Sequence, residues 1–193
     1  MVVKGSTKTF DFKDFVENKD YVGALAILES GQCDCISIFD KLLWIAFCSF
    51  RLGDYSRSKE VYLDLLSGKH GEVPKGLGLY LAIAHFYESS YPEAEKAALS
   101  VPGDFEVKNR ILLQIARVTD DETKVAKYRL HLRDTKQDEL SVAAIELYRH
   151  HYKETADIYE KMIAEDSDDL ALNVYLAVCY YKMVRCLVTL MLN

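Results

Sequence analysis

Apolar residues recur at intervals of three and four along almost the whole chain. The series Leu42, Ile45, Ala46 and Phe50 is typical of the rest. No stretch shows sustained strict alternation of apolar and polar residues, which a half-buried strand would require. The pattern therefore predicts an all-α fold.

A short phrase, a Tyr followed three residues later by a small residue, returns along the chain. The first three tyrosines lie 34 and 36 residues apart, and the last interval, of 61 residues, corresponds to two shortened repeats. A period near 34 is that of the tetratricopeptide repeat (TPR), in which each repeat is a helical hairpin. The four phrases are Tyr21 with Ala24, Tyr55 with Ser58, Tyr91 with Ala94, and Tyr152 with Thr155.

With Gly53 placed in the loop of a hairpin, the repeat predicts a TPR solenoid of about five helical hairpins plus a partial sixth. Pro74, Pro92 and Pro102 fall at predicted helix boundaries, where proline is tolerated. The predicted helices cover about residues 11–16 and 21–29, 39–50 and 55–66, 74–87 and 92–100, 106–118 and 122–132, 138–148 and 152–164, and 170–183.

Three segments follow from these boundaries. Residues 1–10 are expected to form a flexible N-terminus, and residues 11–183 the repeat domain. Residues 184–193 have neither the turn pattern nor the polar face of a terminal repeat, so they are interpreted as a divergent hydrophobic C-terminal tail. This interpretation implies a chain that is cut short or that ends on alternative sequence.

Small residues also recur on the first helix of each hairpin, at positions where it must approach the second helix closely. A large side chain there would hold the two helices apart, at a cost of about 1 to 3 kcal/mol for each overpacked site. The first-helix positions are Ala46, Ala82, Ala143 and Ala177, and they correspond to the small residues of the Tyr phrases.

Composition and charge exclude several classes of function. The formal net charge of −6 and the pI of about 5.4 leave no basic stripe for phosphates, so nucleic acid is not an expected partner. The N-terminus lacks the apolar run of a signal peptide, and the five cysteines are interpreted as reduced. Cys33 and Cys35 could form half of a metal site, but no second pair follows at zinc-site distance, which favours a chance pairing in a loop.

The sequence contains no recognisable catalytic constellation. The five histidines include an adjacent pair, His150 and His151, which cannot chelate as an i, i+4 pair would, and no phosphate-binding loop or nucleophile motif occurs. Residues 165–169 are acidic but lack calcium-loop spacing, so they are interpreted as a loop that favours the next helix N-terminus. No catalytic, cofactor or metal residues and no small-molecule substrate are predicted. Lys182 and Arg185 argue against a membrane span near the C-terminus.

Repeat solenoids bind proteins along the concave face that their first helices line. The positions at which chaperone-adaptor TPR domains carry carboxylate-gripping residues here hold residues such as Trp44 and Tyr80. The apolar groove that results would suit an amphipathic helix or an extended segment, unless its side chains pack only against neighbouring helices. The candidate partner-binding residues are Leu43, Phe47, Phe50, Arg51, Leu79, Ile83, Phe86, Tyr87, Leu140, Leu147 and Tyr148.

Segments between the repeat phrases resemble the intraflagellar transport protein fifty-six family, also called tetratricopeptide repeat protein twenty-six. They are residues 42–55, 109–113, 138–141 and 170–182, and the similarity spans about residues 15–183. The resemblance implies a non-catalytic adaptor subunit of intraflagellar transport complex B, with other complex B subunits as partners. It also implies a role in assembly of the cilium or flagellum and in carrying motility-related cargo.

The same resemblance implies a location in the cilium or flagellum, at the ciliary base and in the cytoplasm. Members of the family continue with further repeats where this chain diverges at Val184, so the chain is expected to be the N-terminal part. The alternative, supported by the repeat alone, is a general cytosolic TPR module such as a chaperone or assembly adaptor.

Overall fold

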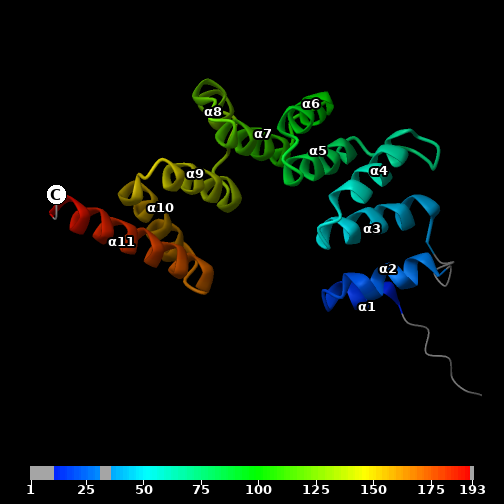
Figure 1. Ribbon diagram of the computed structural model, residues 1–193, viewed down its shortest axis with the longest axis horizontal. Coiled ribbons are helices and arrows are strands. Elements are labelled where there is room, and N and C mark those ends of the chain that lie inside the picture. Colours follow the sequence, from blue (N-terminus) through cyan, green and yellow to red (C-terminus); the bar gives the residue numbers. More distant parts are fainter. Residues whose placement is uncertain (1–10, 31–35, 192–193) are drawn as a thin grey trace, which may run out of the picture. The chain divides into compact units, whose positions relative to one another are not determined.

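The computed structural model describes residues 11–30 and 36–191, and every regular element in these ranges is an α-helix (Figure 1). The expected all-α TPR fold is confirmed. The helices are α1 Phe12–Glu17, α2 Tyr21–Glu29, α3 Ile38–Arg51, α4 Tyr55–Leu66, α5 Leu77–Tyr87, α6 Tyr91–Ser100, α7 Glu106–Val118, α8 Glu122–Arg129, α9 Lys136–Tyr148, α10 Tyr152–Glu165 and α11 Leu170–Met191.

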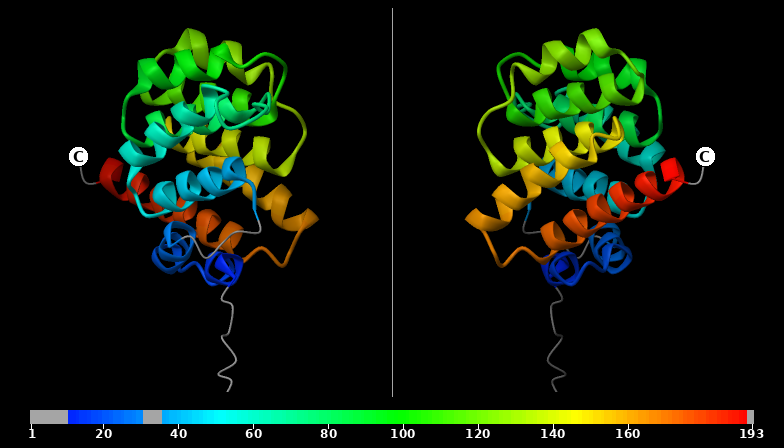
Figure 2. Two further views of the ribbon diagram at one scale, coloured as in Figure 1. Left: turned by 90° about the vertical axis from the view of Figure 1, so that its right-hand side faces the viewer. Right: turned by 90° about the vertical axis from the view of Figure 1, so that its left-hand side faces the viewer.

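The chain divides into two compact units, Met1–Ile111 and Leu112–Asn193, with the division inside α7. In the first unit each helix from α1 to α6 packs against the next one along the chain. In the second unit α9 packs against α10, and α10 against α11. Successive helices lie side by side in opposite directions, as Figure 2 shows for α10, the second helix of the fifth hairpin, and α11, which follows it.

The turn within each hairpin is built in the same way five times. The residue in the turn has a positive φ, and these residues are spaced 34, 36, 31 and 30 apart, which divides the interval of 61 into two short repeats as expected. In the second hairpin the N–H of Gly53 donates to the carbonyl of Phe50, and the N–H of Asp54 to that of Ser49, both at 3.0 Å. This is the Schellman arrangement. The five turn residues are Lys19, Gly53, Ser89, Asp120 and His150.

The residue after each turn is the N-cap of the second helix. Asp20, Asp54 and Asp121 each accept a hydrogen bond from the backbone N–H three residues on, which satisfies a donor that the helix itself leaves free. The fourth hairpin lacks the Tyr phrase, because Glu122 stands where the other hairpins carry Tyr. Its turn geometry is nevertheless the same, so the turn and not the Tyr defines the hairpin.

The small residues lie where the helices of a hairpin approach one another. Those of the second helices, Ala24, Ser58, Ala94 and Thr155, are completely buried, and so are Ala46, Ala82 and Ala143 of the first helices. In α4 the hydroxyl of Ser58 donates to the carbonyl of Ala46 in α3 at 2.9 Å, so the backbones are nearly in contact. Ala177 of α11 is exposed, because no later helix packs over it in the part of the chain described.

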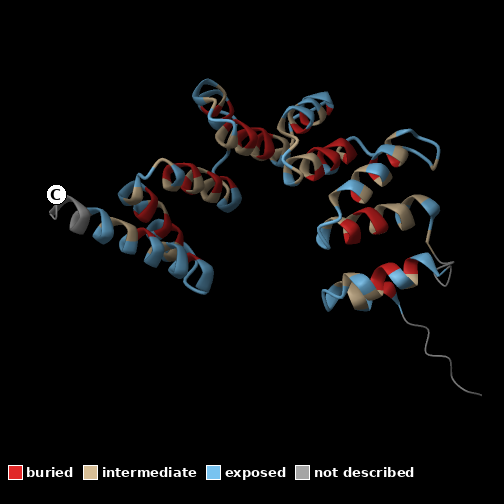
Figure 3. Cartoon of the chain, viewed as in Figure 1, coloured by how far each residue is buried: buried red, intermediate tan, exposed pale blue. Residues whose placement is uncertain are grey.

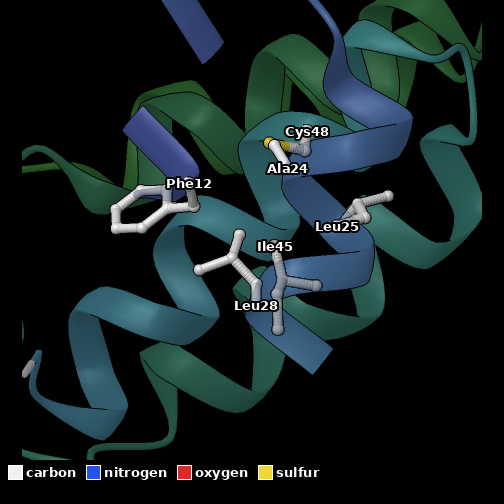
Figure 4. Close-up of a cluster of buried hydrophobic side chains, with 6 residues drawn as sticks. All are labelled: Phe12, Ala24, Leu25, Leu28, Ile45 and Cys48. Atoms are coloured by element: carbon white, nitrogen blue, oxygen red, sulfur yellow. The ribbon is translucent and has the colours of Figure 1, made fainter. Parts of the chain in front are cut away.

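Buried apolar residues form clusters between successive hairpins. The cluster in Figure 4 joins α1, α2 and α3. Cys48 belongs to it, and burial raises the pKa of its thiol to about 11, so the thiol stays protonated at neutral pH. Buried residues line the facing sides of the helices (Figure 3). The residues of the Figure 4 cluster are Phe12, Ala24, Leu25, Leu28, Ile45 and Cys48.

In the second unit a buried carboxylate joins three elements. Arg129 at the end of α8 hydrogen bonds to Glu146 of α9 at 2.6 Å, and His151 at the start of α10 does so at 2.8 Å. Burial raises the pKa of Glu146, but the hydrogen bonds from His151 and Arg129 outweigh that effect, and the pKa lies below its usual value. His151 is thus occupied by a structural contact.

Three helix boundaries differ from those predicted by three residues or more. Helix α5 begins at Leu77, because Pro74 opens a turn whose carbonyl accepts the N–H of Leu77 at 3.0 Å. Helix α8 ends at Arg129 rather than near residue 132. Helix α11 continues past Met183 to Met191, since no Gly or Pro interrupts it. The predicted flexible segment 1–10 and the pair Cys33 and Cys35 lie outside the described residues.

Candidate protein-interaction surfaces

Five rings form a contiguous group at the turn ends of α3 to α6. We call it the aromatic surface. The ring of Tyr87 lies 5.2 Å from that of Phe50 and 5.7 Å from that of Tyr55, measured between centroids. Tyr87 is 56% exposed, and the other four residues are half-buried. The members are Phe50, Tyr55, Phe86, Tyr87 and Tyr91.

The repeat itself places these rings together. Phe50 and Phe86 lie three residues before the positive-φ turn residue, and Tyr55 and Tyr91 lie two residues after it. The fixed turn therefore brings each Phe next to the Tyr of its own hairpin, at 5.4 Å for Phe50 and Tyr55 and 5.6 Å for Phe86 and Tyr91. Rings that hold one another in this way keep a defined orientation.

A charged pair borders the aromatic surface. Glu88 follows Tyr87, and its carboxylate accepts hydrogen bonds from Lys59 and, at 2.9 Å, from Ser56, both in α4. Hydrogen bonds from Lys59 and Ser56 hold the pKa of Glu88 below its usual value. The end of α5 is thereby tied to α4, and the exposed ring of Tyr87 stands beside a carboxylate that already has partners.

A second chain of aromatic contacts runs through α1, α2 and α3. The ring of Trp44 lies 5.5 Å from that of Phe12 and 5.7 Å from that of Phe47, and Phe47 lies 6.0 Å from Tyr21. The guanidinium of Arg51 lies over the ring of Tyr21, 5.1 Å from its centroid, in cation–π geometry. Two of the predicted groove residues, Phe47 and Arg51, therefore share one cluster.

The remaining predicted groove residues of the first unit are aliphatic, and they lie outside both aromatic groups. Leu79 is only 5% exposed and belongs to the core, so it offers no surface to a partner. Leu43 packs against the cluster between α3, α4 and α5, and Ile83 is half-buried. The structure therefore brings Phe50, Phe86 and Tyr87 together, buries Leu79, and leaves the other aliphatic candidates half-buried outside this group.

In the second unit the predicted residues Leu147 and Tyr148 line a pocket of about 440 Å³, whereas Leu140 packs against the core. The pocket lies where the end of α9, the following turn and the start of α10 meet α11. Nδ1 of His150 and the hydroxyl of Tyr152 lie within hydrogen-bond distance at its edge, 2.8 Å apart. The lining residues are Leu147, Tyr148, His150, Tyr152, Val178 and Lys182.

Sequence reasoning missed two kinds of surface residue. Tyr55 and Tyr91 were interpreted only as marks of the repeat, although their spacing from the turn also places them beside Phe50 and Phe86. Val178 and Lys182 were assigned to the last helix without a binding role. Their spacing of four residues, which puts both on one helix face, was the available signal.

The acidic loop before α11 is held by a lysine. Nζ of Lys136 lies 2.7 Å from a carboxylate oxygen of Asp166 and 2.9 Å from one of Asp169. Hydrogen bonding to Lys136 lowers the pKa of both carboxyls, and hydrogen bonding to them, first to Asp166, raises the pKa of Lys136. Asp169 also accepts the N–H of Ala171 at 3.1 Å, so the loop serves the helix N-terminus as expected.

Among residues 11–30 and 36–191, no group of three or more His, Cys, Asp or Glu side chains could hold a metal ion. Within the same ranges, no helix is both long enough and apolar enough to cross a membrane.

Solved structures share the fold. A TPR protein from Parabacteroides merdae superposes with a TM-score of 0.64 at 16% identity, over 89% of this chain and 70% of that one. A thermophilic TPR protein from Thermus thermophilus superposes with a TM-score of 0.72, also at 16% identity, over 88% of this chain and 95% of that one. At such identities the likeness concerns the fold alone.

Comparisons of sequence indicate the family of the chain, and not only its fold. The family model described as intraflagellar transport protein 56 matches residues 42–192. A Caenorhabditis elegans protein described as an intraflagellar transport protein 56 homolog is 31% identical over 185 residues, which cover 94% of this chain. The chain spans about a third of the length of that curated relative, 32%. Because the family model covers most of the residues, including both surfaces described above, this chain belongs to the intraflagellar transport protein 56 family.

Proposed function

We propose that this chain is a non-catalytic adaptor of intraflagellar transport and that it works as a subunit of complex B. In this role it assists assembly of the cilium or flagellum and carries motility-related cargo. The observation that supports the proposal best is the family match over residues 42–192, which runs through successive TPR hairpins. TPR hairpins present stacked helices as extended protein-binding surfaces.

We propose the aromatic surface as one contact through which the adaptor holds a partner. Tyr and Phe contribute a large contact area with little loss of side-chain freedom, and they are enriched in the residues that dominate binding energy. The exposed ring of Tyr87 packs against Phe50, Tyr55 and Phe86, which fixes its orientation before a partner arrives. The cost of ordering this side chain on binding is therefore small.

The location that belongs to this function is the cilium or flagellum, with a pool at the ciliary base and in the cytoplasm. A transport adaptor is loaded at the base and travels with its cargo. Cytosolic TPR chaperone adaptors, the alternative class, would not concentrate there.

The proposal is tested by expressing tagged chain in ciliated cells, precipitating it, and measuring complex B subunits in the precipitate together with its position in the cell. The unaltered chain is expected to bring down complex B subunits and to concentrate at the ciliary base. Tyr87→Ala should reduce the yield of those subunits at least threefold. Tyr80→Ala is the matched control, because Tyr80 lies on the same helix with a similar exposure, 53%, and stacks on Tyr62 outside the aromatic surface.

Two results would contradict the proposal. Complex B subunits absent from the precipitate, together with diffuse cytosolic staining, would refute the ciliary role and favour the general TPR module. Equal recovery with Tyr87→Ala and with the unaltered chain would leave the ciliary role in place and remove the aromatic surface from it.

A further inference from the structure

The pocket in the second unit combines an apolar interior with a cation. Leu147 and Val178 supply aliphatic wall, and the rings of Tyr148 and Tyr152 supply the remaining apolar lining. Tyr148 is 53% exposed and Val178 is 41% exposed, so the pocket opens onto the surface. Its volume of about 440 Å³ lies in the range of pockets that bind ligands.

Lys182 lines this pocket one helical turn after Val178. Among the residues that the structure describes, no Asp or Glu lines the pocket. A second cation, the guanidinium of Arg117, lies over the ring of Tyr148, 5.1 Å from its centroid, and hydrogen bonds to the side chain of Gln114. Over the described residues, neither Lys182 nor Arg117 has an ion pair with a carboxylate.

Several other cations of the second unit are paired with carboxylates. Arg129 pairs with Glu146, Arg149 with Glu122, and Lys136 with Asp166. The chain as a whole carries 30 acidic and 24 basic side chains, so carboxylates are in excess. Lys182 is thus a local positive site on an acidic protein, beside a pocket that no Asp or Glu of the described residues lines, and it suits a carboxylate supplied by a partner.

We propose that this pocket binds a protein segment in which an apolar side chain stands next to an Asp or Glu side chain. The apolar side chain fills the space between Leu147 and Val178, and the carboxylate pairs with Lys182. Burying the apolar group beside the ion pair removes water from it, which strengthens the charge interaction. The inference rests on the proposed adaptor role, because it describes the kind of partner that an adaptor would hold.

The apolar surface continues from the pocket along α11. Val174, 56% exposed, lies one helical turn before Val178 and on the same face of the helix. Most of α11 is exposed along its length (Figure 3). A segment longer than the pocket can therefore cover Val174 as well, so the proposed occupant is a stretch of chain whose Asp or Glu side chain reaches Lys182.

The experiment is a selection by the purified chain from a library of random 16-residue segments, each inserted in a loop of a carrier protein so that both ends are continuous. A second library displays the same segments with a free C-terminus. Enriched sequences from the first library are made as acetylated, amidated peptides, and their Kd is measured by fluorescence anisotropy. The variants are Lys182→Glu and Val178→Ser, with Lys96→Glu on the exposed side of α6 as the control for charge.

We expect enriched segments to carry Asp or Glu within four residues of Leu, Ile, Phe or Met. Lys182→Glu should weaken binding of the acetylated, amidated peptides at least tenfold, and Val178→Ser should weaken it at least threefold. Lys96→Glu should change the Kd less than twofold. Replacing the selected acid by its amide should weaken binding to the unaltered chain but not to Lys182→Glu. Circular dichroism and thermal unfolding of each variant check that the fold is kept.

The inference is overturned if no segment is enriched, if enriched segments show no excess of acidic residues, or if Lys182→Glu binds them unchanged. Enrichment from the free-terminus library alone would also overturn it, in favour of a site for terminal carboxylates. Because peptide binding is measured on the isolated chain and ciliary function in cells, either one can fail while the other holds.

Discussion

The positive-φ turn gives the sharpest test of how this fold is built. Ser89 occupies the turn of the third hairpin at φ 66°, whereas Gly53 occupies the same place in the second at φ 84°. A residue with a Cβ in this conformation costs about 1 to 2 kcal/mol. Ser89→Gly removes that strain but adds about 0.5 to 1 kcal/mol of chain entropy to be lost on folding. The net effect is a stabilisation of about 0.5 to 1 kcal/mol.

The side chain of Ser89 gives this substitution little else to disturb. Ser89 is exposed, and its backbone N–H, which Gly retains, makes the turn hydrogen bond to Phe86 at 2.9 Å. Gly53→Ala is the reverse substitution. A Cβ at Gly53 would meet no atom within 4 Å, so its cost is backbone strain alone, and the variant should lose about 0.5 to 1 kcal/mol.

Urea unfolding followed by circular dichroism measures the change in the free energy of unfolding for both variants. The midpoint temperature of thermal unfolding should rise by roughly 2 to 5 °C for Ser89→Gly and fall by a similar amount for Gly53→Ala. Lys19→Gly, at φ 60° in the first hairpin, is a second test of the stabilising direction. If Ser89→Gly lowers the free energy of unfolding, or if Gly53→Ala leaves it unchanged, backbone strain at the positive-φ turn residue does not control the stability of these hairpins.

Three further predictions concern the core and its charges. Ala46→Trp should destabilise the first unit by about 1 to 3 kcal/mol through overpacking, and unchanged thermal unfolding would disprove the close helix contact. The pKa of Glu146 is depressed in the folded chain, so its stabilisation is present above the unfolded pKa of about 4.3 and is lost as pH falls through the folded value. Glu146→Gln should remove that part of the acid dependence in urea titrations from pH 7 to pH 3. Iodoacetamide at pH 7.5, followed by peptide mass spectrometry, should label exposed Cys186 in the folded chain and Cys48 only after unfolding; early labelling of Cys48 would contradict its burial.

The hairpins could be predicted closely because their determinants are local. The second helices begin at Tyr21, Tyr55, Tyr91 and Tyr152, as the repeated phrase predicts, since the cap and the turn depend on residues within a few positions of one another. The start of α5 was misplaced by three residues because Pro74 is equally suited to the first turn of a helix and to the turn before one.

The candidate surfaces could be predicted only in part. The repeat placed Phe50, Phe86 and Tyr87 among the exposed candidates, and the structure brings them into contact. The repeat also predicts Leu79 as a groove residue. Leu79 is buried, however, by helix packing that the periodicity of the sequence does not specify. Many helices of this protein are apolar on more than one side. The packing of the neighbouring helices decides which of these sides is buried.

By itself, the sequence determined the all-α fold, the hairpin period and most of the helix boundaries, because backbone hydrogen bonds, caps and turns join residues that are near in the chain. Only the tertiary structure decided that Tyr87 meets Tyr55, that Lys182 lines a pocket with Leu147, and that no Asp or Glu of the described residues lines that pocket. These relations join residues from successive hairpins, far apart in the chain. They depend on how one hairpin packs on the next, and no local pattern encodes that packing.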